Sequence, residues 1–187
     1  MKTMAKADGS THVALLRGVN LGGKNKLPMR ELVAILEEHG ASEVRTYIQS
    51  GNAVYRAAPE LAARLPALIA ASIEARLGFR APVVQRTRAE LLAAIEQSPF
   101  LAQGKPPETL HLAFLAERPS AEKIAALDPA RSPGDAFIVQ GGEIHLHLPN
   151  GVARSKLTNA YFDAKLGTVS TVRNWRTVLA LAELAAG

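Results

Sequence analysis

The order of strand-like and helix-like segments predicts an α+β protein made of two ferredoxin-like halves. In the first half, the segments follow one another as strand, helix, strand, strand, helix, strand, which is the split βαβ order. The second half follows a looser version of that order. No Gly/Ser-rich or Pro-rich linker separates the halves, at about residues 11–87 and 88–187. We therefore expect mainly antiparallel sheets packed as one compact unit, after a disordered tail at residues 1–10.

The first half is marked by clear boundary residues. The run from His12 to Arg17 is nearly continuous in apolar residues, which is typical of a buried central strand. Pro28 suits the first position of a helix, and Gly51-Asn52 is a two-residue hairpin signal between two alternating stretches. We expect strands at residues 12–17, 43–50, 53–56 and 82–87, and helices at residues 28–40 and 59–77.

The second half is less regular. Ser120 and Ser155 are each expected to cap a helix, because a serine hydroxyl can accept a hydrogen bond from an N–H of the first turn. Gly141-Gly142 predicts a second hairpin. We expect helices at residues 88–97, 120–127, 155–166 and 173–185, and strands at residues 109–116, 136–140 and 143–148.

Composition narrows the class of protein. Of 187 residues, 48% are apolar but only 5% are aromatic, so the core must be mostly aliphatic. The absence of cysteine excludes disulfides, thiolate zinc sites and cysteine nucleophiles. No secretory signal and no apolar run of membrane-spanning length is present, so we expect a cytoplasmic protein without a membrane partner. The net charge of +5 favours anionic partners such as phosphates or nucleic acid.

The stretch after the first strand is typical of an anion-binding loop. Glycine lets backbone N–H groups approach a ligand closely, and lysine and arginine supply positive charge. The residues of this loop that we expect to bind a ligand are Arg17, Gly18, Asn20, Gly22, Gly23, Lys24 and Lys26.

Three predicted helix starts carry cations, although the helix dipole disfavours lysine and arginine there. Free N–H groups beside cations suit a bound anion, so the three starts are expected to share one phosphate-bearing or otherwise anionic ligand. A solvated basic surface is the alternative interpretation. The cations and their neighbours are Lys24, Lys26 and Arg30 at the first start, Arg154, Ser155 and Lys156 at the second, and Arg173, Asn174 and Arg176 at the third.

Two other motifs give only weak evidence for a nucleotide-binding P-loop and for a metal site. Gly18 to Lys24 matches the G-x-x-x-x-G-K of a P-loop, but Asn25 stands where magnesium binding requires Ser or Thr. His145 and His147 share one strand face and could ligate a metal with His111, but the polar outer face of a hairpin explains them better. We expect neither a metal nor a cofactor, and the catalytic residues of any enzymatic activity stay unknown from the sequence.

Two aromatic side chains are possible stacking groups. Trp175 has the spacing of a core residue, so packing is expected in place of base stacking. Tyr47, beside Arg45 and Gln49 on one strand face, is the better candidate for stacking, although it too could pack against a helix.

Four motifs in order resemble a bacterial family known as domain of unknown function 1697. The resemblance runs from about His12 to the C-terminus. It implies an α+β fold with duplicated ferredoxin-like halves and brings no established activity, cofactor or catalytic residue. The motifs are Leu15-Leu16-Arg17-Gly18-Val19-Asn20-Leu21-Gly22-Gly23, Tyr47-Ile48-Gln49-Ser50-Gly51-Asn52, Pro149-Asn150-Gly151 with Ser155-Lys156-Leu157, and Arg173-Asn174-Trp175 with Thr177.

Three functions remain open. The first is binding of a phosphate-bearing ligand, a nucleotide or a nucleic-acid backbone, at a composite basic site, with Asn52 and Asn174 orienting polar groups. The second is an enzyme acting on a small anionic substrate. The third is a structural or oligomerisation role without a ligand. The sequence does not specify an oligomeric state.

Overall fold

The computed structural model describes residues 9–187 of the chain. The predicted tail at residues 1–10 lies mostly outside the described residues. Its last residue was assigned wrongly, because Ser10 already belongs to the first strand and pairs with Ala57.

The chain divides into two compact units. Unit 1 comprises the residues up to Ala89 together with Glu183–Gly187, and unit 2 comprises Glu90–Ala182. Both divisions fall inside helices, the first in α3 (Arg88–Glu96) and the second in α7 (Trp175–Leu184). None of the helices in residues 9–187 is long and apolar enough to cross a membrane.

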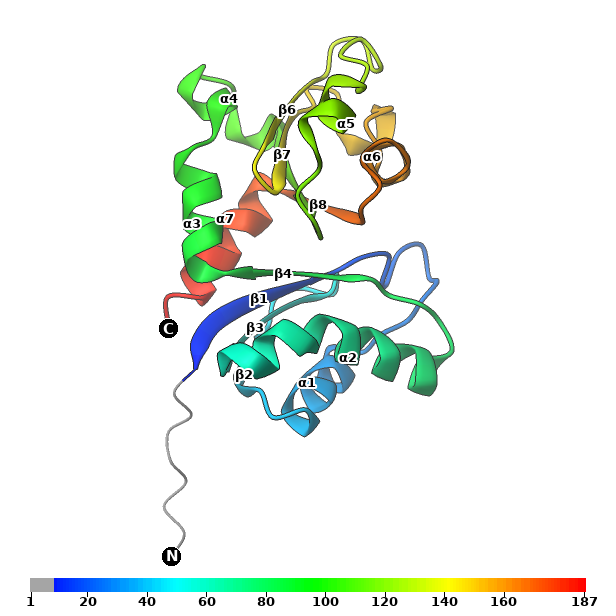
Figure 1. Cartoon of the computed structure of the whole chain (residues 1–187), viewed down its shortest axis with the longest axis vertical. Helices are drawn as coiled ribbons and strands as arrows, with labels where there is room; N and C mark the ends of the chain where they lie inside the picture. Colours follow the sequence, from blue (N-terminus) through cyan, green and yellow to red (C-terminus); the bar gives the residue numbers. More distant parts are fainter. Residues whose placement is uncertain (1–8) are drawn as a thin grey trace, which may run out of the picture. The chain divides into compact units, whose positions relative to one another are not determined.

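Unit 1 has the predicted element order. Its strands are β1 (Ser10–Leu16), β2 (Ser42–Thr46), β3 (Asn52–Ala57) and β4 (Val83–Thr87), and its helices are α1 (Met29–Glu38) and α2 (Pro59–Leu77). The strands form an antiparallel sheet in the order β2-β3-β1-β4, and α1 and α2 cover one face of it (Figure 1).

Unit 2 repeats this arrangement. Its antiparallel sheet has the order β6-β7-β5-β8, which is the unit 1 order moved along by four strands. The predicted duplicated α+β fold is therefore confirmed. The remaining elements are α4 (Pro99–Ala102), β5 (Leu110–Leu115), α5 (Ala121–Ala125), β6 (Ala136–Gln140), β7 (Glu143–His147), α6 (Asn159–Leu166) and β8 (Ser170–Asn174), with short 3-10 turns at Pro107–Thr109 and Val152–Arg154.

Strand β8 was missing from the sequence prediction, which placed a helix start at Arg173. In the structure Arg173 pairs with Leu112 of β5, and the helix begins only at Trp175. The β-branched residues Thr171 and Val172 favour a strand here. The polar residues that follow them break the apolar pattern by which a strand is recognised in the sequence. With this strand, the element order of unit 2 becomes the same as that of unit 1.

The turn between β2 and β3 is also wider than predicted. Strand β2 ends at Thr46 and β3 begins at Asn52, so the connection is residues 47–51 and not a two-residue turn at Gly51-Asn52. Ile48, in this connection, has a φ of 48°, which is unusual for a β-branched residue and costs about 1–2 kcal/mol.

Each unit has its own aliphatic core between its sheet and its helices. In unit 1, Leu32, Ile35 and Leu36 of α1 and Leu65 and Ile69 of α2 pack on the sheet. In unit 2, the corresponding core includes Ala113, Ile144, Leu146 and Phe162. Trp175 is buried with Phe100 and Leu110, as its spacing predicted.

The other face of the unit 2 sheet holds a buried histidine. His145 is 2% exposed, and it lies on the face opposite Ile144 and Leu146 because side chains alternate along a strand. Its neighbour across the sheet is Leu112, which in turn lies beside Arg173. No described residue hydrogen-bonds the Nδ1 atom of His145, and burial lowers the pKa of this histidine to about 4.

We expect acid to destabilise unit 2 through His145. Its pKa is about 4 when folded and 6.5 in the reference state, so the unfolded chain binds more protons between these pH values. The free energy of unfolding therefore falls as the pH drops through this window, by about 2 kcal/mol at pH 5. Urea unfolding at pH 7.5 and 5 measures the loss, and His145→Leu should remove the part that His145 contributes, while His111 and His147, whose pKa values burial also lowers, keep theirs. An unchanged pH dependence in His145→Leu would contradict this assignment.

Candidate functional site

The residues predicted to bind a ligand fall in both units. Unit 1 holds Arg17, Gly18, Asn20, Gly22, Gly23, Lys24, Lys26 and Asn52, and unit 2 holds Ser155, Lys156, Arg173 and Asn174. That all of these residues share one ligand stays a prediction from the sequence.

The loop between β1 and α1 closes on itself as a small hairpin. Leu21 and Lys24 form an isolated antiparallel bridge, and the N–H of Lys24 donates to the carbonyl of Leu21 over 2.9 Å. Between them, Gly22 and Gly23 have φ angles of 54° and 77°, as the tight turns of β-hairpins require. A Cβ atom at either glycine would meet nothing within 4 Å, so backbone conformation and not lack of space favours glycine here.

Asn20 fixes the shape of this loop from within. Its Oδ1 accepts from the N–H of Leu27 at 2.8 Å, and its Nδ2 donates to the carbonyl of Leu27 at 2.8 Å. The same Nδ2 donates to the carbonyl of Gln49 at 2.6 Å, in the connection between β2 and β3. One carboxamide therefore closes the first loop and joins it to a second loop 29 residues away.

Asn52 does the same for the second loop. It is fully buried, and its Nδ2 donates to the carbonyl of Tyr47 at 3.1 Å and to Oγ of Ser50 at 2.9 Å. The N–H of Tyr47 donates in turn to the carbonyl of Asn52. The hydrogen bonds of Asn20 and Asn52 to the chain itself suit a role in shaping the two loops.

Gly51 lets the two loops approach each other. Its carbonyl accepts from the N–H of Leu16 at 2.8 Å. A Cβ atom on Gly51 would lie 2.6 Å from Cγ2 of Val19 and 2.7 Å from Cβ of Leu16, and its φ is 76°. A side chain at this position would therefore push the loops apart.

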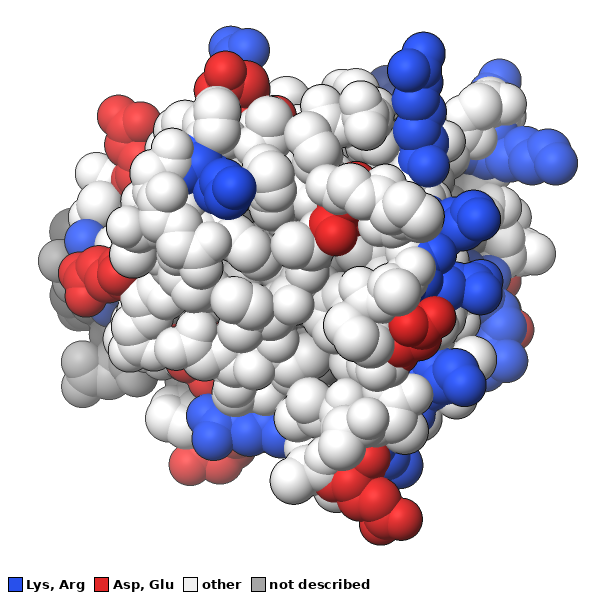
Figure 2. Space-filling model, turned by 90° about the horizontal axis from the view of Figure 1, so that it is seen from above, with Lys and Arg blue, Asp and Glu red and all other residues white. Residues whose placement is uncertain are grey.

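The first loop carries charge of one sign. Lys24 and Lys26 are exposed and Arg17 is half-buried, while residues 9–30 contain no Asp or Glu. No residue within 9–187 forms an ion pair with Lys24 or Lys26. Figure 2 colours Lys and Arg blue and also shows Asp and Glu in red on the visible face, so the lack of acidic residues is a feature of this loop and not of the whole surface.

In unit 2, the predicted helix start at Ser155 was wrong. Helix α6 begins at Asn159, and Oγ1 of Thr158 caps it by accepting from the N–H of Tyr161. Leu157 is buried in the core, so the chain stays extended until it has passed this anchor. Ser155 accepts instead from the N–H of Leu157, a local turn typical of serine.

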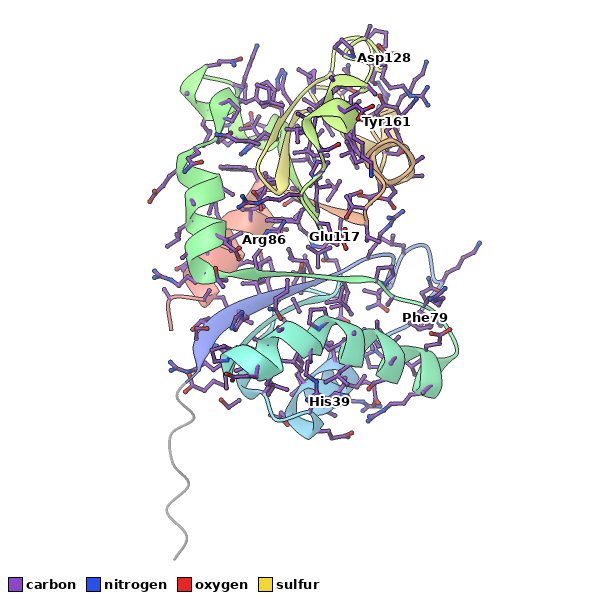
Figure 3. All side chains as sticks on the ribbon, in the orientation of Figure 1. His39, Phe79, Arg86, Glu117, Asp128 and Tyr161 are labelled. Atoms are coloured by element: carbon purple, nitrogen blue, oxygen red, sulfur yellow. The ribbon has the colours of Figure 1, made fainter. Side chains whose placement is uncertain are left out.

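Lys156 is therefore a loop residue, and a hydrogen bond from its backbone N–H fixes its position in the loop. Its N–H donates to Oγ of Ser132 at 3.0 Å, and that hydroxyl donates to Oδ2 of Asp135 at 2.6 Å. Nearby, Tyr161 accepts from the N–H of Asp128 at 2.8 Å, and both residues are labelled in Figure 3. The side chain of Lys156 itself is exposed.

Arg173 and Asn174 do not begin a helix as predicted, and their contacts with a ligand stay a prediction. Arg173 lies in strand β8 and is buried, which lowers its pKa to about 10. Its guanidinium donates to Oγ1 of Thr171 at 2.8 Å. Asn174 ends the strand, and its Oδ1 accepts from the N–H of Thr177 in the first turn of α7 at 2.8 Å, so it acts as a helix cap.

Sequence reasoning missed the counterpart of Arg173 in unit 1. Arg86 of β4 faces Val13 as Arg173 faces Leu112, and each is 8% exposed. In each arginine, Nη1 donates a hydrogen bond to the carbonyl oxygen of the preceding residue, over 2.8 Å in Arg86 and 2.9 Å in Arg173. Arg86 lies on the face of β4 away from α1 and α2 (Figure 3). Both arginines stand two residues before a helix, a signal that an internal alignment would have found.

The histidines of unit 2 do not form a common site. His111 pairs with Leu146, so it lies on the sheet face opposite His145 and His147. No group of three or more His, Asp or Glu in the described part of the chain could hold a metal ion.

We expect Asn20→Ala to lower the free energy of unfolding by about 2–3 kcal/mol. The variant loses three hydrogen bonds to backbone groups and places alanine at a φ of 54°. Asn20→Gly, which tolerates this φ, should lose less. Urea unfolding measures both, and Asn150→Ala at an exposed turn is the control, with an expected change below about 0.5 kcal/mol. If Asn20→Ala changed the free energy of unfolding as little as this control, the conformation of the loop would not depend on the Asn20 carboxamide.

Comparison with known proteins supports the fold. The chain is similar to the structure of conserved bacterial protein SP0830 from Streptococcus pneumoniae, with a TM-score of 0.71 and 18% identity over 96% of this chain and 99% of that chain. No curated protein matches the chain. The sequence model of the family described as "Protein of unknown function (DUF1697)" matches residues 10–145. Since this match spans most of the chain, the protein belongs to the DUF1697 family.

Proposed function

We propose that the chain binds a phosphate-bearing ligand, a nucleotide or a nucleic-acid backbone, through the loop between β1 and α1. Arg17, Lys24 and Lys26 contact phosphate oxygens in this proposal, and the exposed turn at Gly22-Gly23 lets a ligand approach the backbone closely. The observation that carries the proposal is a loop of one charge sign whose shape is fixed by its own hydrogen bonds.

Fixing the loop matters because binding has an ordering cost. A flexible loop that must become ordered on its ligand loses affinity in proportion to the freedom it gives up. The three hydrogen bonds of Asn20 hold the loop in one conformation without help from a ligand. Lys24, which is also held by its backbone bond to Leu21, then needs to order only its side chain.

Charge supports a polyanionic partner. Lys24 and Lys26 have no acidic partner among residues 9–187, so no ion pair has to be broken when phosphate binds. The net charge of +5 adds long-range attraction to nucleic acid. Binding of this kind releases counterions and therefore weakens as salt is added.

The composite form of the proposal, predicted from the sequence, adds Lys156, Arg173 and Asn174 of unit 2. Lys156 suits it best, since its side chain is exposed while Ser132 holds its backbone. Lys156→Gln separates the two forms. A loss of affinity in this variant supports the composite site, and wild-type affinity restricts the site to the unit 1 loop.

The test is the salt dependence of nucleic-acid binding. Fluorescence anisotropy of labelled DNA and RNA should show binding whose log affinity falls linearly with log salt. Lys24→Gln with Lys26→Gln removes two phosphate contacts and should reduce the slope by about 1.4 for single strands. A second titration with a labelled nucleotide tests the smaller ligand.

A charge-matched control separates the loop from net charge alone. Arg64→Gln with Lys165→Gln removes the same two charges from exposed helix positions outside the loop. This control should keep the wild-type slope to within its experimental error. Absence of any salt-sensitive binding at low ionic strength would disprove the nucleic-acid form, and equal losses in both double variants would disprove the role of the loop.

A further inference from the structure

We infer that the ligand of this loop pair is a single-stranded nucleic acid whose unpaired bases pack on Tyr47, Ile48 and Leu21. The inference rests on the proposed function, since the same loop cations would contact the phosphates. The loop pair is defined as residues 17–27 and residues 47–51.

Large apolar side chains are exposed at the tips of both loops. Leu21 is 63% exposed and Ile48 is 50% exposed, the two highest values among the large apolar residues in the described part of unit 1. Leu21 follows Asn20 in the chain and Ile48 precedes Gln49, so they flank the 2.6 Å hydrogen bond that joins the loops. Both exposed side chains are therefore carried by residues next to the point where the two loops are joined.

The backbone holds Ile48 outward at a conformational cost. Its φ of 48° lies in the left-handed region that glycine and asparagine adopt easily and a β-branched residue does not. Hydrogen bonds on both sides of it, from Asn20 to Gln49 and from Asn52 to Tyr47, maintain this conformation. An asparagine or glycine would be more stable here, so the exposed isoleucine points to a role in binding.

Tyr47 adds an aromatic ring to the second loop, directly before Ile48. Its N–H and its carbonyl are both bonded to Asn52, so its backbone is fixed, while its side chain is partly exposed. An aromatic ring on a fixed backbone can stack on any base, because every base has a π face.

Apolar groups beside cations distinguish among phosphate-bearing ligands. A duplex presents mainly phosphates and keeps its bases stacked inside, so it would leave Leu21 and Ile48 without a partner. Single strands offer phosphates to Lys24 and Lys26 and unpaired bases to the apolar side chains. The combination of charge and exposed apolar surface therefore favours single strands.

The test compares single-stranded and duplex probes of one sequence, as both DNA and RNA, by fluorescence anisotropy. Single strands should bind on the order of tenfold more tightly than duplexes. Tyr47→Ala should lower the affinity for single strands on the order of tenfold, and Tyr47→Phe should restore it. Whichever of DNA and RNA binds more tightly identifies the sugar that the site prefers.

Ile48→Asn gives a readout that a structural role cannot imitate. Asparagine tolerates the left-handed conformation, so the variant should unfold at a higher temperature and yet bind single strands several-fold more weakly. Leu179→Gln is the matched control, because Leu179 is 45% exposed on α7, away from these loops in the sequence, and should bind as the wild type does.

The outcomes separate the two proposals. Equal affinity for single strands and duplexes, or unchanged binding in Ile48→Asn and Tyr47→Ala, overturns the inference while the salt-dependent effect of Lys24 and Lys26 can still stand. Failure of all nucleic acids to bind disproves the inference and the nucleic-acid form of the proposed function, while binding in the nucleotide titration would keep its nucleotide form. Light scattering that shows a dimer, dissociated by Ile48→Asn, overturns the inference in favour of a second copy of the chain on this surface.

Discussion

The pairing of β1 with β3 on one side and β4 on the other determines where the candidate site forms. Leu15 pairs with Asn52, and Leu16 pairs with Val83, so the C-terminal end of β1 meets the N-terminal ends of both neighbours. The loop that follows β1 and the connection that precedes β3 must therefore leave the sheet side by side. Every contact between the two loops depends on this register.

Short polar and glycine contacts then convert that proximity into a fixed arrangement. Asn20 reaches Gln49 across the gap, and Gly51 leaves room for Val19 and Leu16. Asn52 uses its side chain and its backbone to hold Tyr47. These groups satisfy backbone donors and acceptors that would otherwise need water, which lets an irregular loop pair keep one conformation.

The sequence predicted the parts of the fold that depend on local patterns. Period-two alternation, the long alanine- and leucine-rich helix and the hairpin glycines placed nearly all the strands and helices of both units. Strand β8 was not predicted from the sequence, because it is short, carries Arg173 and is followed by a helix without a loop between them. The helix start at Ser155 failed because Thr158, three residues on, is an equally good cap, and only the burial of Leu157 decides between them.

The candidate site was less predictable, for a physical reason. Glycines and cations marked the first loop in the sequence, because their effects are local. The bond from Asn20 to Gln49 spans 29 residues, and nothing near either residue reveals it. Similarly, the left-handed conformation of Ile48 follows from contacts made by Asn20 and Asn52 and has no signal in its own residue type.

The internal repeat gives the strongest reason to look for function in the unit 1 loops. Unit 2 has the same strand order, yet it connects β5 to α5 through residues 116–120, which include Glu117 (Figure 3), and β6 to β7 through Gly141-Gly142 alone. In unit 1, the corresponding connections are residues 17–28 and 47–51. The fold itself therefore needs neither the long basic loop nor the strained turn. Loops carry function more often than the strands and helices that position them, and here the residues that unit 1 has in addition are the ones that carry the cations and the exposed apolar side chains.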